Sequence, residues 1–328
     1  MKHVTAAGEL KEITHAERLL VVHADKGWLE PLSQSAFDFF TKLVPHMETK
    51  GVATVTVELD SPLSDAMLAQ PHLHLIFGDR PQYRNNTLHV SPAYIWGFWY
   101  LDEVGINANS TLRMRKFCPN DVDWGHAEWF WNGVTSHMLN SNVSRSAQQE
   151  RVRYDLEPAT AVIFAQDIED RFPRPHFVST EDIIQNAVRA AQGGRIYVKS
   201  HPSAREDTTR KLSEICEHEP NVVITDASIH DLTQVSDWVI TQNSSAGFEA
   251  LMQRKPVITC GRSDYHHATV VARSGDELRD IIKNRKGVMD GYEYEKYLYW
   301  FLSDHCVEPQ REDFAELVWN RLRDKAMI

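Results

Sequence analysis

The chain of 328 residues is long enough for two domains that each bury a full hydrophobic core. Its 46 acidic residues outnumber its 35 Lys and Arg residues, and the net charge of −11 argues against a broad nucleic-acid interface. Four cysteines lack CxxC spacing, so neither a zinc site nor a disulfide framework is indicated. No signal peptide and no apolar run of about 18 residues is seen, so we expect a cytoplasmic protein, with peripheral association with a membrane left open.

The first half of the chain is predicted to be an α/β region, from a helix at 33–51 and strands at 18–24, 53–59, 72–77 and 87–93. Residues 91–131 are rich in aromatic side chains and have neither a strand nor a helix period, so we expect irregular surface structure there. These rings can stack on sugars, meet lipid or simply pack in a core. A polar helix is expected at 141–156.

The second half alternates regularly between short apolar strands and amphipathic helices. Strands are predicted at 160–166, 195–200, 221–226, 237–242 and 256–261, and helices at 179–194, 204–219, 230–236 and 244–255. This alternation is typical of a parallel sheet covered on both faces, a Rossmann-like domain. Two more helices, at 291–304 and 310–327, are expected to pack back on the first domain.

Ligands of open α/β sheets bind where strands end, so the residues after each strand are the first candidates for a site. After the strand at 237–242 come Asn243, Ser244, Ser245, Gly247 and Glu249. Hydroxyls and small residues at a helix start suit a phosphate, whereas a plain N-cap is the structural alternative. Glu249 fits either a capping box or a contact with ribose hydroxyls.

Two other strand ends carry polar residues. Lys199, His201 and Pro202 follow one strand, and their cation and imidazole suit a phosphate ester, although an ordinary loop histidine is the alternative. Gln166 and the acidic residues up to Glu169 and Asp170 follow another, where carboxylates can supply a nucleophile or a general acid or base, or form a solvated acidic turn.

A metal site is not expected. His266 and His267 are adjacent, but no third ligand stands at a sensible spacing, and the cationic groups named above can stabilise charge on a leaving phosphate without a divalent ion. The sequence therefore predicts neither a metal nor a cofactor.

The order of three segments resembles the bacterial capsule polysaccharide synthesis family, the Kps-type GT-B glycosyltransferases that move Kdo from CMP-Kdo. The segments are AQDIED at 165–170, KSHP at 199–202 and QNSSAGFEAL at 242–251, followed by KPVITCG at 255–261. The resemblance covers about residues 160 to 270 and implies a GT-B-like fold, with two Rossmann-like domains facing a cleft.

The resemblance also implies roles for the candidate residues. His201 and Pro202 would hold cytidine monophosphate, and Glu249 its ribose. Ser244, Ser245 and Gly247 would hold its phosphate. Asp170 would be the catalytic carboxylate of a retaining double displacement, with Glu169 the next choice, because the family usually has two adjacent aspartates where this chain has Glu169 and Asp170.

The domain limits expected on this basis are 14–152 for an acceptor-side domain, 153–287 for a nucleotide-sugar binding domain and 288–328 for helices that cross back. The expected function is transfer of Kdo or a related sugar to a saccharide or glycolipid acceptor of a surface polysaccharide. A UDP-sugar transferase, a GT-B-shaped epimerase and a non-catalytic glycan-binding partner of a polysaccharide assembly complex remain alternatives.

Overall fold

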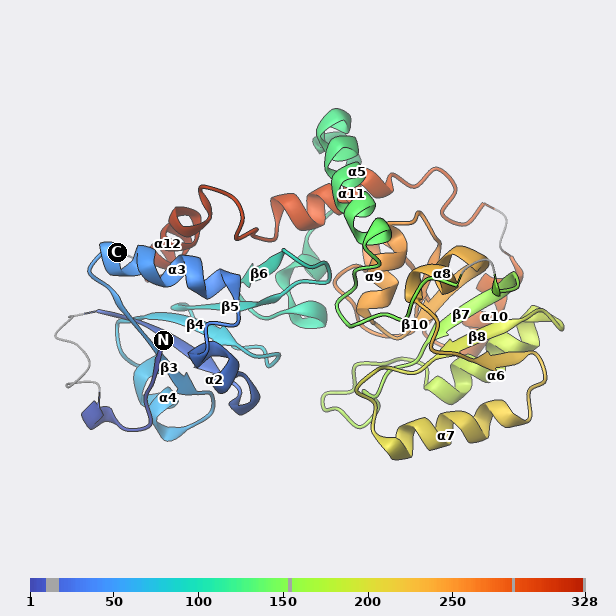
Figure 1. The fold of residues 1–328 in the computed structure, drawn as a ribbon, viewed down its shortest axis with the longest axis horizontal. Coiled ribbons are helices and arrows are strands. Elements are labelled where there is room, and N and C mark those ends of the chain that lie inside the picture. Colours follow the sequence, from blue (N-terminus) through green and yellow to red (C-terminus); the bar gives the residue numbers. More distant parts are fainter. Residues whose placement is uncertain (10–17, 153–154, 285–286, 327–328) are drawn as a thin grey trace. The chain divides into compact units, whose positions relative to one another are not determined.

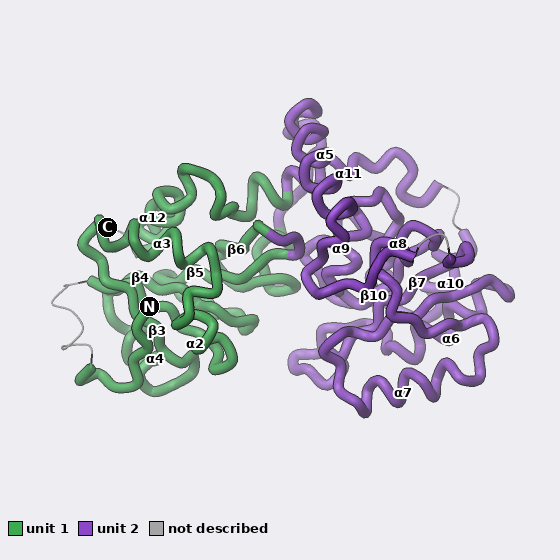
Figure 2. Tube along the Cα trace, in the orientation of Figure 1, with its two compact units in different colours: residues 1–93, 97–114, 301–328 green, residues 94–96, 115–300 purple. Residues whose placement is uncertain are grey.

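A computed structural model describes residues 1–9, 18–152, 155–284 and 287–326. The chain divides into two compact units (Figure 2). Unit 1 comprises residues 1–93, 97–114 and 301–328, and unit 2 comprises residues 94–96 and 115–300. The expected domain starts at residues 14 and 153 lie outside the described residues, and the predicted domain limits stay a prediction.

Unit 1 is built on a sheet in which six described strands follow the order β1-β3-β2-β4-β5-β6. All neighbours are parallel except β5 and β6. The strands span Lys2–His3 (β1), Leu19–Ala24 (β2), Ala53–Glu58 (β3), Leu73–Phe77 (β4), Thr87–Pro92 (β5) and Trp99–Asp102 (β6). The four predicted strands are thus confirmed. Strands β2 and β4 are buried along their whole length, which explains their continuous apolar runs.

Helices cover this sheet and close its core. They span Lys26–Ser33 (α2), Asp38–Thr49 (α3), Pro62–Leu68 (α4) and Phe314–Lys325 (α12). Helix α12 inserts Phe314, Val318 and Leu322 into the core that also contains Phe39 of α3. The expectation that the last helix packs on the first unit is therefore confirmed. For the helix predicted at 291–304 it was wrong in part, because α11 (Tyr294–Leu298) packs on α5 (Trp124–Asn140) in unit 2.

A chain of buried polar groups also runs through unit 1. His23 Nδ1 lies 2.8 Å from Ser64 Oγ, and His23 Nε2 lies 3.0 Å from His74 Nδ1. His74 Nε2 lies 3.2 Å from the carbonyl oxygen of Gln70, which can only accept. His74 Nε2 must therefore carry a proton, and the direction of every bond follows: Ser64 donates to His23, which donates to His74.

The aromatic region 91–131 is more regular than expected. It contains the end of β5, strand β6 and the start of helix α5 (Trp124–Asn140), with 3₁₀ turns at Asn107–Asn109, Thr111–Met114 and Pro119–Asp121. Helix α5 has no clear apolar period because it buries only Ala127, Thr135 and Met138. Its start at Asp123 is nevertheless a normal cap, in which the carboxylate accepts the N–H of His126 at 2.8 Å.

The surface assignment of this region was also wrong in part, since many of its rings are buried. Tyr94, Trp99 and Tyr100 belong to the core, whereas Trp96 and Trp129 are 74% and 80% exposed. Core packing is therefore the correct alternative for the first three rings.

The helix predicted at 141–156 is absent from the described residues 142–152. This segment is instead fixed by long-range bonds, above all between Arg151 and Asp231 and from the Val152 N–H to Asp231. Its polar pattern reflects these bonds rather than a solvated helix.

Unit 2 contains a sheet whose described strands are all parallel, in the order β12-β11-β10-β7-β8-β9. The strands span Ala159–Phe164 (β7), Ile196–Lys199 (β8), Val222–Ile224 (β9), Ser236–Thr241 (β10), Val257–Thr259 (β11) and Val270–Val271 (β12). The five predicted strands are confirmed. The chain order reverses between β7 and β10, which makes this neighbouring pair the topological switch point.

The helices of unit 2 alternate with these strands (Figure 1). They span Thr180–Ala191 (α6), Glu206–Glu217 (α7), Ile229–Val235 (α8), Ser245–Leu251 (α9) and Gly275–Lys283 (α10), and a 3₁₀ turn lies at His266–Ala268. A π-helix at Tyr299–Asp304 begins in unit 2 and ends in unit 1. Helix α10 was not predicted, although its cap is visible in the sequence: Ser274 accepts the N–H of Glu277, and Glu277 accepts the N–H of Arg273.

Candidate functional site

Gln166 and Asn243 meet at the switch point, one after β7 and the other after β10. Gln166 Oε1 accepts the N–H of Asn243 at 2.8 Å, and Gln166 Nε2 donates to Asn243 Oδ1 at 3.1 Å. Thr241 Oγ1 lies 3.1 Å from the same Gln166 oxygen. Asn243 then donates to the carbonyl of Arg262 at 2.9 Å. The amide of Gln166 therefore ties three loops together at the carboxyl edge of the sheet.

Ser244 caps helix α9 directly after this junction. Its Oγ accepts the N–H of Ala246 at 3.2 Å, and its own N–H donates to Thr241 Oγ1 at 3.2 Å. Ser244 is 8% exposed, whereas Ser245 is half-buried and open to a ligand. The N-cap alternative is thus confirmed for Ser244, which also accepts the N–H of Gly247 on its carbonyl oxygen at 3.0 Å.

Gly247 lies where helix α9 presses against its neighbours. A Cβ at this position would lie 2.8 Å from Thr241 Cγ2 and 2.9 Å from Tyr265 Oη. Tyr265 is itself fixed by donating its hydroxyl to the carbonyl of Ser244 at 2.7 Å. Close packing of helix and strand therefore accounts for this glycine without any ligand.

Glu249 is buried beneath the segment that follows α5. Its Oε1 accepts the hydroxyl of Ser144 at 3.0 Å, and the residue is 1% exposed. Burial raises the pKa of Glu249 to about 8, against the smaller opposing effects of Ser144 and Arg145. Glu249 Oε2 makes no hydrogen bond to any residue that the structure describes.

Lys199 and His201 follow β8 but face different neighbours. The Lys199 ammonium donates to the carbonyls of Asp226 and Ala227 at 2.7 and 3.0 Å, and burial lowers its pKa. His201 is exposed, with Nδ1 accepting the N–H of Ser203 at 3.1 Å. The other ring nitrogen, Nε2, therefore lies on the side of the ring away from Ser203. His201 and Pro202 belong to the same exposed turn.

Although His201 is exposed at the surface, part of its ring is shielded from water; this shielding, and then the positive charges of Arg171 and Arg145, lower the pKa of His201. A neutral imidazole among cations is suited to an anionic ligand, because an added negative charge relieves their mutual repulsion.

The two candidate carboxylates after β7, Asp170 and Glu169, have different hydrogen-bond partners. Asp170 Oδ2 accepts from Arg205 Nη2 at 2.6 Å, and the same guanidinium holds Asp167 at 2.9 Å. These bonds to Arg205 lower the pKa of Asp167. Glu169 turns the other way, with Oε1 accepting from Gln242 Nε2 at 3.1 Å and from the N–H of Thr180 at the start of α6.

Three residues near these strand ends, Arg205, Ser144 and Arg145, were not found as site residues from the sequence. Arg205 was read as part of a helix, and Ser144 and Arg145 as part of another. Tyr94 donates its hydroxyl to the buried Asp264 at 2.7 Å and stacks on Phe248 of α9. Asp264 lies soon after the strand at 256–261, and this position was the sequence signal for it. The other contacts join segments that are distant in the sequence.

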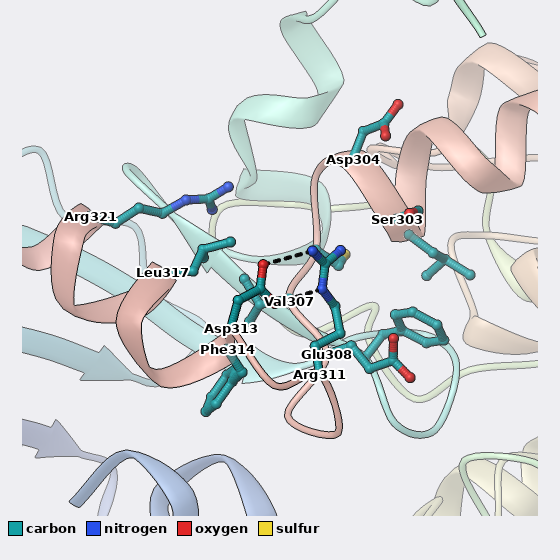
Figure 3. Close-up of a pocket in the computed structure, with 12 residues that line it drawn as sticks. Ser303, Asp304, Val307, Glu308, Arg311, Asp313, Phe314, Leu317 and Arg321 are labelled. Carbon is teal, nitrogen blue, oxygen red and sulfur yellow. Dashed lines mark hydrogen bonds and ion pairs between the residues drawn. The ribbon is translucent and has the colours of Figure 1, made fainter. Parts of the chain in front are cut away.

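A separate cavity of about 60 Å³ lies in unit 1, between the π-helix and α12. Arg311 and Asp313 line this cavity and form a salt bridge with two hydrogen bonds (Figure 3). It has room for only a few water molecules, so it cannot hold a nucleotide sugar.

The described residues contain neither a metal-type cluster nor a helix of membrane-spanning length. No three His, Cys, Asp or Glu side chains there are grouped to hold a metal ion. No helix among them is long and apolar enough to span a membrane.

Residues 135–285 match the family described as capsule polysaccharide biosynthesis protein. The matched segment is a little less than half of the chain. All the candidate site residues lie within the matched segment. Protein FixF of Sinorhizobium fredii is 27% identical over 195 residues, which are 57% of this chain and 45% of FixF. The match thus spans less than half the length of that relative.

Solved structures are similar to this chain in fold. Thermosulfurimonas dismutans KpsC, beta Kdo 2,7 transferase, matches with a TM-score of 0.54 and 15% identity, over 94% of this chain and 100% of that one. The KpsC beta Kdo 2,4 transferase of the same organism has a TM-score of 0.48 and 17% identity, over 83% and 91%. The first likeness confirms the predicted GT-B-like fold, with a Rossmann-like sheet in each unit.

Proposed function

We propose that this protein is a glycosyltransferase of capsular polysaccharide biosynthesis that transfers Kdo or a related sugar from a CMP-activated donor. One observation carries the proposal. The family match spans 135–285, and within it the candidate residues follow β10, β7 and β8, three adjacent strands of one parallel sheet. Ligands of such sheets bind at this carboxyl edge, beside the switch point.

The donor nucleotide is held after β8 and β10. His201 and Pro202 contact the cytidine monophosphate, with Lys199 holding the neighbouring loop through its two carbonyl bonds. Ser244, Ser245 and the first turn of α9 receive the phosphate, and Glu249 serves the ribose. Asn243 and Gln166 keep this edge in shape through their paired amides.

Asp170 is the proposed nucleophile. Its carboxylate oxygen bonds to the anomeric carbon as the bond from that carbon to the phosphate oxygen breaks, and CMP leaves with the electron pair. An acceptor hydroxyl then attacks the same carbon, displaces Asp170 as a carboxylate and passes its proton to solvent water, so the configuration is retained. Arg205 holds the carboxylate before donor binding.

The acceptor is a saccharide or glycolipid, and we place the reaction in the cytoplasm. Charge on the departing phosphate is stabilised by His201, the N–H groups at the start of α9 and the nearby arginines, so no divalent ion is required.

Calorimetric titration with CMP, UMP, UDP and GDP tests the donor assignment. We expect selective binding of CMP that is lost in His201→Ala and in the double variant Ser244→Ala/Ser245→Ala. Ser274→Ala is the matched control, because Ser274 caps α10 in the same unit as Ser244 caps α9. Preference for a uridine nucleotide, or CMP binding indifferent to both variants, would contradict the proposal.

A further inference from the structure

The segment 142–152 is fastened along α8, although it forms no helix or strand of its own (Figure 1). Its contacts are a bond from Ser228 Oγ to Asn142 Oδ1 at 2.7 Å, one between His230 Nε2 and the Val143 carbonyl at 2.9 Å, one from the Ile229 N–H to Gln148 Oε1 at 3.0 Å, and the pairing of Arg151 with Asp231. Residues 144 and 145 are therefore held in place from both sides.

Ser144 is the point where this segment touches α9. The Ser144 hydroxyl donates to Glu249 Oε1, so its proton points inward and its two lone pairs face away from the carboxyl. Ser144 is half-buried while Glu249 is fully buried, so Ser144 stands between Glu249 and the surface. A hydroxyl oriented in this way acts outward as an acceptor, which suits a donating ligand hydroxyl.

Arg145 is exposed and follows Ser144 directly. Its positive charge acts on two groups at once, lowering the pKa of Glu249 on α9 and of His201 after β8. Because Arg145 directly follows Ser144, whose hydroxyl lies 3.0 Å from Glu249 Oε1, it lies beside the proposed donor site, and its guanidinium is a cation suited to a phosphate.

We propose that Ser144 and Arg145 are part of the nucleoside monophosphate site, with Ser144 accepting a hydrogen bond from a ribose hydroxyl and Arg145 pairing with the phosphate. This inference rests on the proposed function, since it names further contacts of the same donor nucleotide. Glu249 then acts through Ser144, as the positioning residue that fixes the direction of its hydroxyl.

The test compares CMP with 2′-deoxy- and 3′-deoxycytidine monophosphate by calorimetry. The wild-type protein should bind CMP about 5- to 10-fold more tightly than one of the deoxy forms, the worth of one hydrogen bond. Ser144→Ala should remove that preference, and Ser144→Thr, which keeps the hydroxyl, should restore it. Ser146→Ala, two residues along the same segment, should leave the preference unchanged.

Arg145→Gln provides a second measurement on an exposed residue, where folding is not at stake. It should weaken CMP binding about 10-fold and leave cytidine binding unchanged, because cytidine lacks the phosphate. Absence of CMP binding in the wild type would overturn the proposed function and this inference together. Wild-type CMP binding with the ribose preference intact in Ser144→Ala, or an equal loss of CMP and cytidine in Arg145→Gln, would overturn this inference alone.

Discussion

Gln166 and Asn243 are joined by two hydrogen bonds, of 2.8 and 3.1 Å, across the switch point of unit 2. The pair connects the end of β7 to the start of α9, so the shape of the proposed phosphate site depends on it.

Replacing Gln166 should weaken both folding and nucleotide binding. Gln166→Leu leaves the N–H of Asn243 without its acceptor, which we expect to lower the free energy of unfolding by about 1–3 kcal/mol. Chemical denaturation and CMP titration measure the two effects. Gln166→Glu keeps the acceptor but loses the donated bond, so its loss of unfolding free energy and of CMP affinity should be intermediate. Equal losses in the two variants would show that the bond accepted from Asn243 does not contribute.

Asp170→Asn should abolish sugar transfer, by roughly 10³-fold or more, because the amide cannot form the covalent intermediate. Asp167→Asn is the matched control, since Asp167 shares Arg205 with Asp170 and should cost far less. Transfer assays with CMP-Kdo and intact-mass detection of a sugar adduct give the readouts. A dead Glu169→Gln beside an active Asp170→Asn would move the nucleophile to Glu169.

Burial of Glu249 should make stability fall with rising pH. The folded protein holds its proton up to about pH 8, whereas the unfolded chain releases it near the ordinary value of 4.5. The destabilisation therefore begins near pH 4.5, grows by about 1.4 kcal/mol per pH unit and levels off above pH 8. Urea unfolding at several pH values should show that the unfolding free energy of Glu249→Gln rises relative to that of the wild type across this range. Parallel curves of unfolding free energy against pH would rule the effect out.

The histidine pair of unit 1 should act in the opposite direction. Burial, with a smaller contribution from the positive charge of nearby Arg84, lowers the pKa of His23 to about 3 and of His74 to about 4, from 6.5. The unfolded chain then binds protons that the folded one refuses, so stability is complete above pH 6.5 and is lost as the pH falls toward 4. His74→Gln retains an acceptor and a donor but cannot ionise. Its unfolding free energy should fall less steeply in acid than that of the wild type, and an identical slope would contradict this account.

Gly247→Ala should destabilise unit 2 by about 1–3 kcal/mol, because the added methyl group collides with Thr241 and Tyr265. Gly133→Ala is the control: Gly133 lies inside α5 with nothing within 4 Å of its missing Cβ, so the change should stabilise by about 0.5–1 kcal/mol. Thermal unfolding of both variants measures the difference. Similar behaviour of the two would mean that α9 moves away from its strand at little cost.

Local patterns were sufficient for most of the sheet in unit 2. Strands β7, β8, β10 and β11 carry two-sided apolar runs, which only a sheet covered on both faces explains. The strand ends then indicated which polar residues to examine. The meeting of Gln166 with Asn243 is also a consequence of that topology, because adjacent parallel strands end at the same edge.

Contacts between distant segments were beyond local patterns. Ser144 and Glu249 are 105 positions apart, and no pattern in either segment predicts their contact. Arg151 looked like one residue of a polar helix until Asp231 was seen to bind it. Helix α5 escaped prediction for another reason, since a helix that buries so few side chains leaves no apolar stripe to detect.

The core of unit 1 has a consequence for how the chain is made. Its sheet strands lie within the first 102 residues, but Phe314, Val318 and Leu322 complete the core on which they pack. A ribosome synthesises all of unit 2 before it reaches α12. During synthesis the first unit therefore has an incomplete core with exposed apolar surface. The second unit, whose elements are consecutive over residues 115–300, can fold before α12 is made.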